Sequence, residues 1–425
     1  MSDAPGAPIA GDEAVTPAFQ PPPGNPRFAL SDALRGLAVL TVVWAHAEGV
    51  AGAQSNHGFG AIVVKANIAV HVFFALSGFL LYRPFVTARA AGRELPSLRE
   101  YARRRLLRIV PGYWVALTVL AVVLTVPLAL SSHWWRYYTF TWIYSGNTAV
   151  AGSGDGPTWS LAIEMRCYLL MGLFAWAVRA APAGRKWWRN EVVGLVLAFA
   201  VAVFGTAAPH AGIHTIGVLG SGFPWFVEAF LMGMALAVWS VWIERTRSNP
   251  GIIKLVRRHP GLFWLAGAGT WVLAALGFRH LLGGSDILAQ YRHLATRDWL
   301  SDWSLTLVAA FCFTFPALFG DRAGGLPRRI LSTRALVWIG VISYGMYLYH
   351  YPIEVELAGR LLGHGHVLLG NHVLTVLVPG LVLTVLAGTA SYYLVELPFL
   401  KRKYRKTPAS EPPLIAVAET PAGSH

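Results

Sequence analysis

Long apolar runs recur along the whole chain and constrain its fold more than any other feature. Ten segments are apolar over enough residues to cross a bilayer, which takes about 20 residues of helix. The chain is 55% hydrophobic and 13% charged, whereas soluble domains have about 25% charged residues. We therefore expect an all-α, polytopic integral membrane bundle. The ten predicted transmembrane helices are 33–50, 63–85, 108–130, 157–180, 191–208, 222–243, 261–282, 300–320, 335–357 and 372–396.

The distribution of Lys and Arg predicts the orientation of this bundle. Of 35 basic residues, 28 lie in the N-terminal flank, in alternate loops and after the last span, and five lie in the other loops. Because basic residues concentrate on the cytoplasmic side, both termini should be cytoplasmic. Clustering between apolar runs also explains the net charge of +14 without a nucleic-acid partner. We expect a multi-pass protein of the inner (plasma) membrane, in contact with membrane lipid.

The rest of the composition indicates one domain. We expect a transmembrane domain over residues 29–406, between disordered cytoplasmic tails at 1–28 and 407–425 that are rich in Pro, Ala and Gly. No basic region precedes Arg27, so a signal peptide is not expected. Cys167 and Cys312 lie in apolar segments without metal-ligand spacing. They therefore indicate neither a disulfide nor a metal site.

The first predicted span contains Arg35 and His46. On a helix the two residues are separated by roughly 16 Å along the axis and by about 20° around it, so they share a face. Ionisable side chains inside a membrane usually face the bundle interior or a water-filled path. The pair is therefore a candidate site along one cavity. The structural alternatives are a snorkelling anchor for Arg35 and a hydrogen-bonded packing residue for His46.

Arginines also cluster where the third span begins, in "REYARRRLLRIVPGYW" (99–114). Several guanidinium groups at a membrane surface suit the phosphates of a cofactor. The alternative is an anchor that fixes topology through its positive charge. The candidate phosphate clamp comprises Arg103, Arg104, Arg105 and Arg108.

An acidic residue lies inside the fourth predicted span. In "GPTWSLAIEMRCYLL" (156–170), Glu164 and Arg166 are two residues apart and cannot face each other on a helix. Each needs another partner. Glu164 could orient His46 or pair with an arginine, and the structural alternative is a buried ion pair.

Three further polar residues are weaker candidates. Ser77 precedes Gly78 in a pattern typical of close helix packing, and no base is placed beside it. His71 is ambiguous. His350 lies near the outer end of the ninth span, where an aromatic belt accounts for the neighbouring tyrosines.

Six stretches in this order resemble the membrane acyltransferase-3 family over about residues 31–405. The first, "DALRGLAVLTVVWAH", is similar to the family's "DGLRGIAALLVVLFH". The order and spacing of all six make the resemblance specific, although any one is weak. The other five are "VFFALSGFLLYRPF", "RRLLRIVPGYW", "WSLAIE", "SYGMYLYHYP" and "LVELPFLKR".

The resemblance implies ten transmembrane helices and O-acyl transfer from cytoplasmic acyl-CoA to a hydroxyl group. By motif position, Arg35 and His46 match the family's essential first-span pair, and Glu164 matches its fourth-span glutamate. Arg105 and Arg108 match its Arg-x-x-Arg motif. Acyl-CoA, with acetyl-CoA expected, would be a co-substrate, and no permanently bound cofactor is expected. Some members carry an added SGNH-hydrolase domain, and this chain resembles the stand-alone members.

The sequence departs from the family pattern at positions that bear on the acceptor. The family often has "EEQFY" where this chain has Glu164 to Tyr168, and His71 stands where many members have an acidic residue. The acceptor is therefore predicted only as a hydroxyl on a glycan, glycolipid or secondary metabolite.

In the expected mechanism, acyl-CoA phosphates bind the arginine cluster and the pantetheine arm passes Arg35. Neutral His46 then takes the proton from the acceptor hydroxyl. Arg35 could instead stabilise the oxyanion, and an acyl-histidine intermediate stays open. The rival functions are a transporter or flippase of lipid-linked or small amphipathic substrates, and a glycolipid ligase using a polyprenyl donor. Buried Arg, His and Glu would also suit a transport path.

Overall fold

The computed structural model describes residues 28–52, 62–63, 65–123, 132–144, 156–179, 186–208, 226–281, 295–319 and 325–404. The two predicted tails lie outside these residues, except for Phe28. Within the described ranges every regular element is a helix, which confirms the all-α expectation.

Ten helices of 19 to 26 residues form the bundle in the described part of the chain. Nine are long and apolar enough to cross a membrane, and α16, which carries His350 and Glu354, is the tenth. Each corresponds to one predicted span. They are α1 (Ala29–Val50), α3 (Ile68–Ala90), α4 (Leu98–Val123), α7 (Trp159–Arg179), α8 (Trp187–Ala207), α10 (Val227–Thr246), α12 (Pro260–Leu281), α14 (Thr296–Phe319), α16 (Arg334–Leu357) and α17 (His372–Ala390).

Short helices connect or extend these. The π-helix η7 and α18 continue α17 without a break. The short elements are η1 (Lys65–Asn67), α5 (Trp134–Tyr138), η2 (Trp142–Tyr144), η3 (Gly156–Thr158), α11 (Gly251–Arg258), α15 (Gly325–Leu331), η5 (Ala358–Leu362), η6 (Leu368–Gly370), η7 (Ser391–Glu396) and α18 (Leu397–Tyr404).

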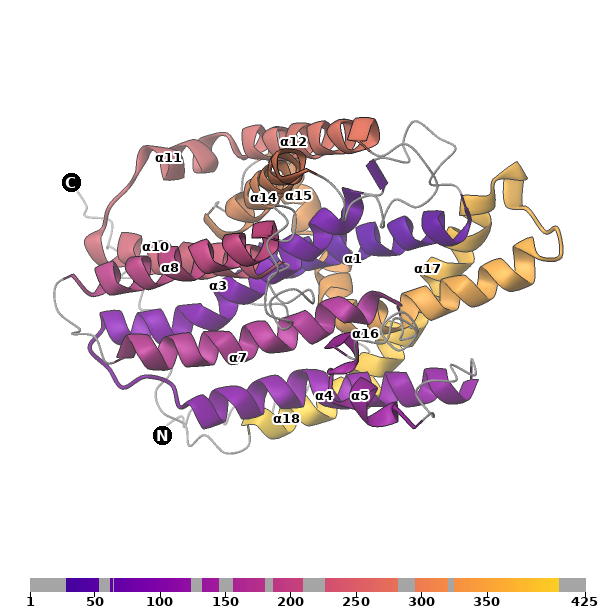
Figure 1. The fold of residues 1–425 in the computed structure, drawn as a ribbon, viewed down its shortest axis with the longest axis horizontal. Helices are drawn as coiled ribbons and strands as arrows, with labels where there is room; N and C mark the ends of the chain where they lie inside the picture. The colour runs from indigo at the N-terminus through magenta and orange to yellow at the C-terminus, as the bar shows by residue number, and fades with distance from the viewer. Residues whose placement is uncertain are drawn as a thin grey trace, which may run out of the picture.

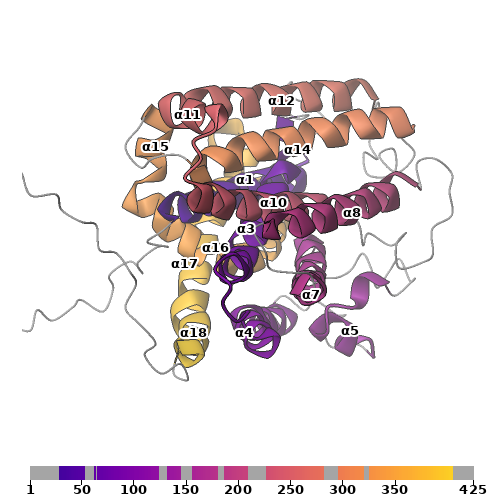
Figure 2. The same cartoon turned by 90° about the vertical axis from the view of Figure 1, so that its left-hand side faces the viewer.

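The helices are arranged around α1, α3, α10 and α16. Figure 1 shows α3, α7 and α4 running side by side, and Figure 2 looks nearly along them. In both views α12 and α14 cover one side of the bundle, and α4 with α18 lies on the opposite side.

Glycines allow two central helix pairs to pack backbone against backbone. A Cβ atom on Gly340 of α16 would lie 1.7 Å from the carbonyl oxygen of Asp32 in α1. A Cβ atom on Gly78 of α3 would lie 2.1 Å from the carbonyl oxygen of Phe230 in α10. Small residues serve this purpose in membrane bundles, where packing rather than water exclusion holds helices together. The first contact fixes α1 relative to α16, and both helices carry candidate site residues.

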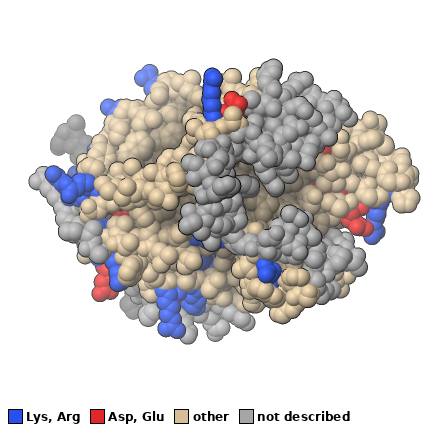
Figure 3. Space-filling view, in the orientation of Figure 1, with Lys and Arg blue, Asp and Glu red and all other residues tan. Residues whose placement is uncertain are grey.

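The beginning of α4 differs from the expected boundary. The span was expected from residue 108, but the helix begins at Leu98 and includes the whole arginine cluster. Glu100 in its first turn forms ion pairs with Arg103 and Arg104, at the three- and four-residue spacings that stabilise a helix. On the face drawn in Figure 3, most Lys and Arg side chains lie towards the left, the end at which α3 ends and α4 begins in Figure 1.

Candidate functional site

Two histidines that are 304 positions apart in the sequence meet between α1 and α16. Nδ1 of His46 lies 3.1 Å from Nε2 of His350, and the ring centroids are 5.0 Å apart. The ring of Tyr351 packs edge-on against His46, with its centroid 5.4 Å away. His350 is fully buried, whereas His46 is partly exposed. The structure thus gives His46 a specific partner.

The backbone fixes the tautomers of this pair. Nδ1 of His350 lies 2.8 Å from the carbonyl oxygen of Tyr347. A carbonyl oxygen only accepts, so Nδ1 of neutral His350 carries the hydrogen and Nε2 carries the lone pair. Nδ1 of His46 faces that lone pair and, at 3.0 Å, the carbonyl oxygen of Val42, and must therefore donate. The lone pair of His46 is left on Nε2, the arrangement a general base requires.

A second set of hydrogen bonds holds the α16 side of the pair in place. The Tyr347 hydroxyl donates to the carbonyl oxygen of Pro157 in η3. Ser160, at the start of α7, lies 2.8 Å from the same hydroxyl and donates to it. The tyrosine ring lies 5.6 Å from that of His350. The α7 motif is therefore linked through Tyr347 to the histidine pair.

Glu164 lies one helical turn beyond Ser160 on α7, and its contacts are with α3 and α7. Its carboxylate accepts hydrogen bonds from the Ser77 hydroxyl, at 3.0 Å, and from the Tyr168 hydroxyl. Its described hydrogen bonds do not include His46, whose partner is His350. The catalytic role of Glu164 stays a prediction, but the geometry places His350, and not Glu164, where it can orient His46.

Two guanidinium groups converge one further turn along α7. Arg105 of α4 lies within electrostatic range of Arg35 of α1 and of the Tyr101 and Tyr168 side chains. Within the ranges that the structure describes, the Nε atoms of both arginines are buried without a hydrogen-bond partner. No described carboxylate forms an ion pair with either. Partly buried cations without an acidic partner form a ready site for an anion.

Arg108 differs from Arg105 because it already has a counter-ion. Its Nη1 lies 3.3 Å from Oε2 of Glu396, whose side chain is fully buried, and its guanidinium lies over the ring of Tyr344. Glu396 is the last residue of the π-helix η7, and its other oxygen accepts a hydrogen bond from Ser391. Sequence reasoning missed this glutamate as a site residue, although it lies in the "LVELPF" motif. Its acidity inside an apolar segment was the available signal.

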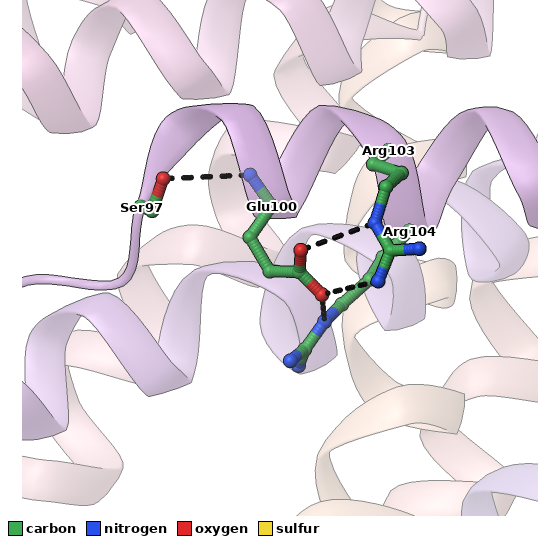
Figure 4. Close-up of polar contacts among 4 residues, drawn as sticks. All are labelled: Ser97, Glu100, Arg103 and Arg104. Carbon is green, nitrogen blue, oxygen red and sulfur yellow. Dashed lines mark hydrogen bonds and ion pairs between the residues drawn. The ribbon is translucent and has the colours of Figure 1, made fainter. Parts of the chain in front are cut away.

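Arg103 and Arg104 have a different partner, Glu100. Figure 4 shows both guanidinium groups on Glu100, with Arg103 bound through two nitrogens. The three side chains are about one-third exposed. The four arginines predicted as one clamp therefore separate into two with Glu100, one with Glu396, and Arg105 beside Arg35.

The site residues consequently lie in a column that follows α7. Ser160, Glu164 and Tyr168 are spaced four residues apart on one face of that helix, about 6 Å per step. Tyr347 links the histidine pair to Ser160, and Ser77 donates to Glu164. Arg35 and Arg105 lie within electrostatic range of Tyr168. Arg35 and His46 lie at the two ends of this column, and the expectation that they line one path stays a prediction.

Cys167 and Cys312 are buried free thiols. Among the described residues, no group of three or more His, Cys, Asp or Glu side chains could hold a metal ion.

Comparison with known proteins identifies the family. Residues 29–393 match a family described as an acyltransferase domain, acyltransferase-3. The chain is 26% identical to the peptidoglycan O-acetyltransferase OatA of Listeria monocytogenes, over 87% of this chain and 54% of that protein. It is 24% identical to the O-acetyltransferase OatA of Staphylococcus aureus, over 90% of this chain and 58% of that protein. It therefore spans little more than half the length of these two relatives.

A third relative is similar in length. The acyltransferase MdmB of Streptomyces mycarofaciens is 26% identical over 94% of this chain and 98% of its own. No solved structure matches the chain. The family match extends from the first residue of α1 to within η7 and includes every predicted site residue. The chain is thus a multi-pass membrane protein that belongs to the acyltransferase-3 family.

Proposed function

We propose that the protein is an O-acyltransferase that moves a short acyl group from cytoplasmic acyl-CoA to a hydroxyl group of a glycan, glycolipid or secondary metabolite. One observation carries this proposal. His46 is held by His350 so that its Nε2 lone pair is free, above two guanidinium groups that have no carboxylate partner among the described residues. A base and an anion site in one column suit a hydroxyl acceptor and a phosphate-bearing donor.

Arg35 and Arg105 are the donor-binding residues in this proposal. Their guanidinium groups receive phosphates of CoA, and Arg108 is held by Glu396 at the same end of the column. The grouping of Arg35 with Arg105 favours donor binding over the alternative role at the oxyanion. Arg103 and Arg104, which pair with Glu100, supply positive charge at the surface that attracts the anionic donor.

The acyl transfer itself takes place at His46. Nε2 removes the proton of the acceptor hydroxyl as its oxygen bonds to the acyl carbon of the thioester. The carbon–sulfur bond breaks, and the same proton passes from His46 to the CoA sulfur. His350 keeps the imidazole in the required tautomer through both steps. Glu164, fixed by Ser77 and Tyr168, helps to hold the substrates between the two ends of the column.

The positive-inside distribution supports a donor that arrives from the cytoplasm, with both termini on that side of the inner membrane. The acceptor reaches His46 from the opposite end of the column. The name of one relative favours a glycan, because it is called a peptidoglycan O-acetyltransferase. The relative that matches in length is named only as an acyltransferase, so the glycolipid and metabolite acceptors stay open.

The test compares native cells with a deletion strain complemented by wild type, His46→Gln or His364→Gln. His364 is an exposed histidine near the end of α16 and serves as the matched control. Lipid, glycan and culture-medium extracts are compared by mass spectrometry, with protein levels verified. An acyl mass increment restored by wild type and His364→Gln but absent with His46→Gln supports the proposal.

Restoration by His46→Gln would remove His46 from catalysis. A second assay distinguishes the transferase from the competing flippase. Purified protein is incubated with acetyl-CoA and extracted acceptor. Only the transferase releases free CoA thiol, whereas a flippase moves its substrate without consuming thioester.

A further inference from the structure

An apolar groove of about 730 Å³ lies between α8, α10 and α14, outside the catalytic column. Val192 and Val196 of α8 form one wall and are 41% and 60% exposed, so the groove opens to the lipid-facing surface. Ala235 and Trp239 of α10 form the other. Its volume is in the range of sites that bind discrete small molecules.

The start of α8 and the end of α10 lie together at one end of this groove. Consecutive residues of α3 show this, because Tyr82 donates to Glu191 of α8 and Arg83 binds Glu244 of α10. Trp188 and Trp242, each three residues or fewer from these glutamates, both line the groove. Indole rings concentrate at the headgroup level of a bilayer. This end therefore lies at a membrane surface.

The same end presents two exposed cations. Arg189 follows Trp188, and Arg245 lies three residues after Trp242, on the groove side of α10. No ion pair with a described carboxylate is formed by either. The nearby acids are occupied, since Glu191 is held by Tyr82 and Arg89, and Glu244 by Arg83.

We infer that this groove is a binding site for an anionic glycerophospholipid of the surrounding bilayer. Its phosphate lies between Arg189 and Arg245, and one acyl chain lies along α8 against the Ala235 side of α10. Inside a bilayer a lipid acyl chain gains no hydrophobic free energy by moving from neighbouring lipids into the groove. Packing of the acyl chain and the charge of the headgroup therefore decide whether one lipid stays bound. Positive charge at the Trp-lined end favours a lipid with an anionic headgroup.

The experiment measures lipid bound to the whole protein and does not depend on acyltransferase activity. Protein is delipidated in detergent and exchanged into mixed micelles of dioleoyl phosphatidylglycerol and dioleoyl phosphatidylcholine at equal amounts. Native mass spectrometry then counts lipid adducts. We expect one phosphatidylglycerol per chain, at least fivefold in excess over phosphatidylcholine.

Three variants test the location. Arg189→Gln with Arg245→Gln removes the headgroup contacts and should abolish the preference for phosphatidylglycerol. Ala200→Trp fills the groove and should reduce the adduct at least fivefold. Ala198→Trp is the matched control, because it lies on the same helix but lines a separate apolar groove of about 370 Å³ between α7, α8 and α10.

Equal adducts in all variants, or equal retention of the two phospholipids by wild type, would overturn the inference and leave only exchangeable bulk lipid. A co-purified lipid-linked glycan displaced by Ala200→Trp would also overturn it, by assigning the groove to a lipid-linked acceptor.

Discussion

Nε2 of His350 accepts a hydrogen bond from Nδ1 of His46 across the contact between α1 and α16. Which nitrogen of His46 carries the lone pair therefore depends on α16 as much as on α1. The partner holds the ring in place and selects its tautomer, but does not reach the reacting atoms. The two histidines should therefore differ in how their loss affects the reaction.

Replacing His46 should remove the base, whereas replacing His350 should leave the base in place but less well oriented. We expect His46→Gln to lower kcat about 10²- to 10⁴-fold, the usual contribution of a positioned acid–base group. His350→Gln should lower kcat by roughly 10-fold to 100-fold, the range seen when a supporting partner of an imidazole is lost. Steady-state kinetics with acetyl-CoA would measure both, with KM for the donor nearly unchanged. A His350→Gln enzyme with normal kcat would contradict the orienting role.

Arg105 and Arg104 should differ sharply although they are adjacent. Arg105 has no carboxylate partner in the described part of the chain. Arg105→Gln should therefore remove a charged hydrogen bond to donor phosphate, equivalent to about 1.5–3 kcal/mol or roughly a 10- to 150-fold rise in KM for acyl-CoA. Arg104→Gln removes a pair with Glu100 that is about one-third exposed, and should change KM less than about threefold. Kinetics with acetyl-CoA and its 3′-dephospho form measure this. Equal effects of the two substitutions would remove Arg105 from the phosphate site.

Glu396 should act on the donor through Arg108. Glu396→Gln keeps the shape of the side chain but removes the charge that holds the guanidinium in the column. We expect KM for acyl-CoA to rise several-fold while kcat changes little, because His46 is untouched. Binding of CoA by calorimetry provides an independent measure. Glu356→Gln, which loses an exposed pair with Arg360, is the control, and a lower KM in Glu396→Gln would mean that the glutamate competes with phosphate.

The contact between α1 and α16 should be sensitive to a single methyl group. In Gly340→Ala the new Cβ would lie against the backbone of Asp32, and such overpacking costs about 1–3 kcal/mol. Thermal unfolding in detergent should show a lower Tm. Gly269→Ala in α12 meets nothing within 4 Å and should leave Tm equal or slightly higher. A Gly340→Ala protein as stable as wild type would show that the two helices can separate.

Glu354 is a buried carboxyl group that the proposed chemistry does not use. It is fully buried in α16, one turn beyond His350, and neither oxygen has a hydrogen-bond partner in the described structure. Burying an unpaired polar group costs about 1–3 kcal/mol, so Glu354→Met should raise Tm while activity persists. Thermal unfolding measures the first and acyl transfer the second. Loss of activity in a stably folded Glu354→Met protein would instead give this carboxyl a role beside His350.

Local periodicity accounts for what the sequence predicted well. Arg35 and His46 share a face because 11 helical steps nearly complete three turns, and each apolar run became one helix. The pairing of Arg103 and Arg104 was also within reach, since Glu100 precedes them at the three- and four-residue spacings. The prediction of a single arginine clamp does not account for this spacing.

Contacts between distant segments could not be predicted in the same way. His350 was only a weak candidate because nothing near it in the sequence indicates that α16 packs along α1. Ser77 had no visible base because Glu164 follows it by 87 residues. The resemblance to a family placed the motifs correctly, but only the fold shows which of them touch.

The backbone contact at Gly340 has a consequence for how substrates reach His46. Because α1 and α16 touch without intervening side chains at Asp32, a molecule dissolved in the membrane cannot slip sideways between these two helices at that level. This contact lies 14 residues before His46, roughly 21 Å along α1, so it closes the gap between the two helices at the end away from the histidine pair. In the proposed reaction, with a cytoplasmic donor and an acceptor that arrives from the other surface, the acyl group crosses the membrane while its carrier stays behind, and no pumping step is needed to give the transfer a direction.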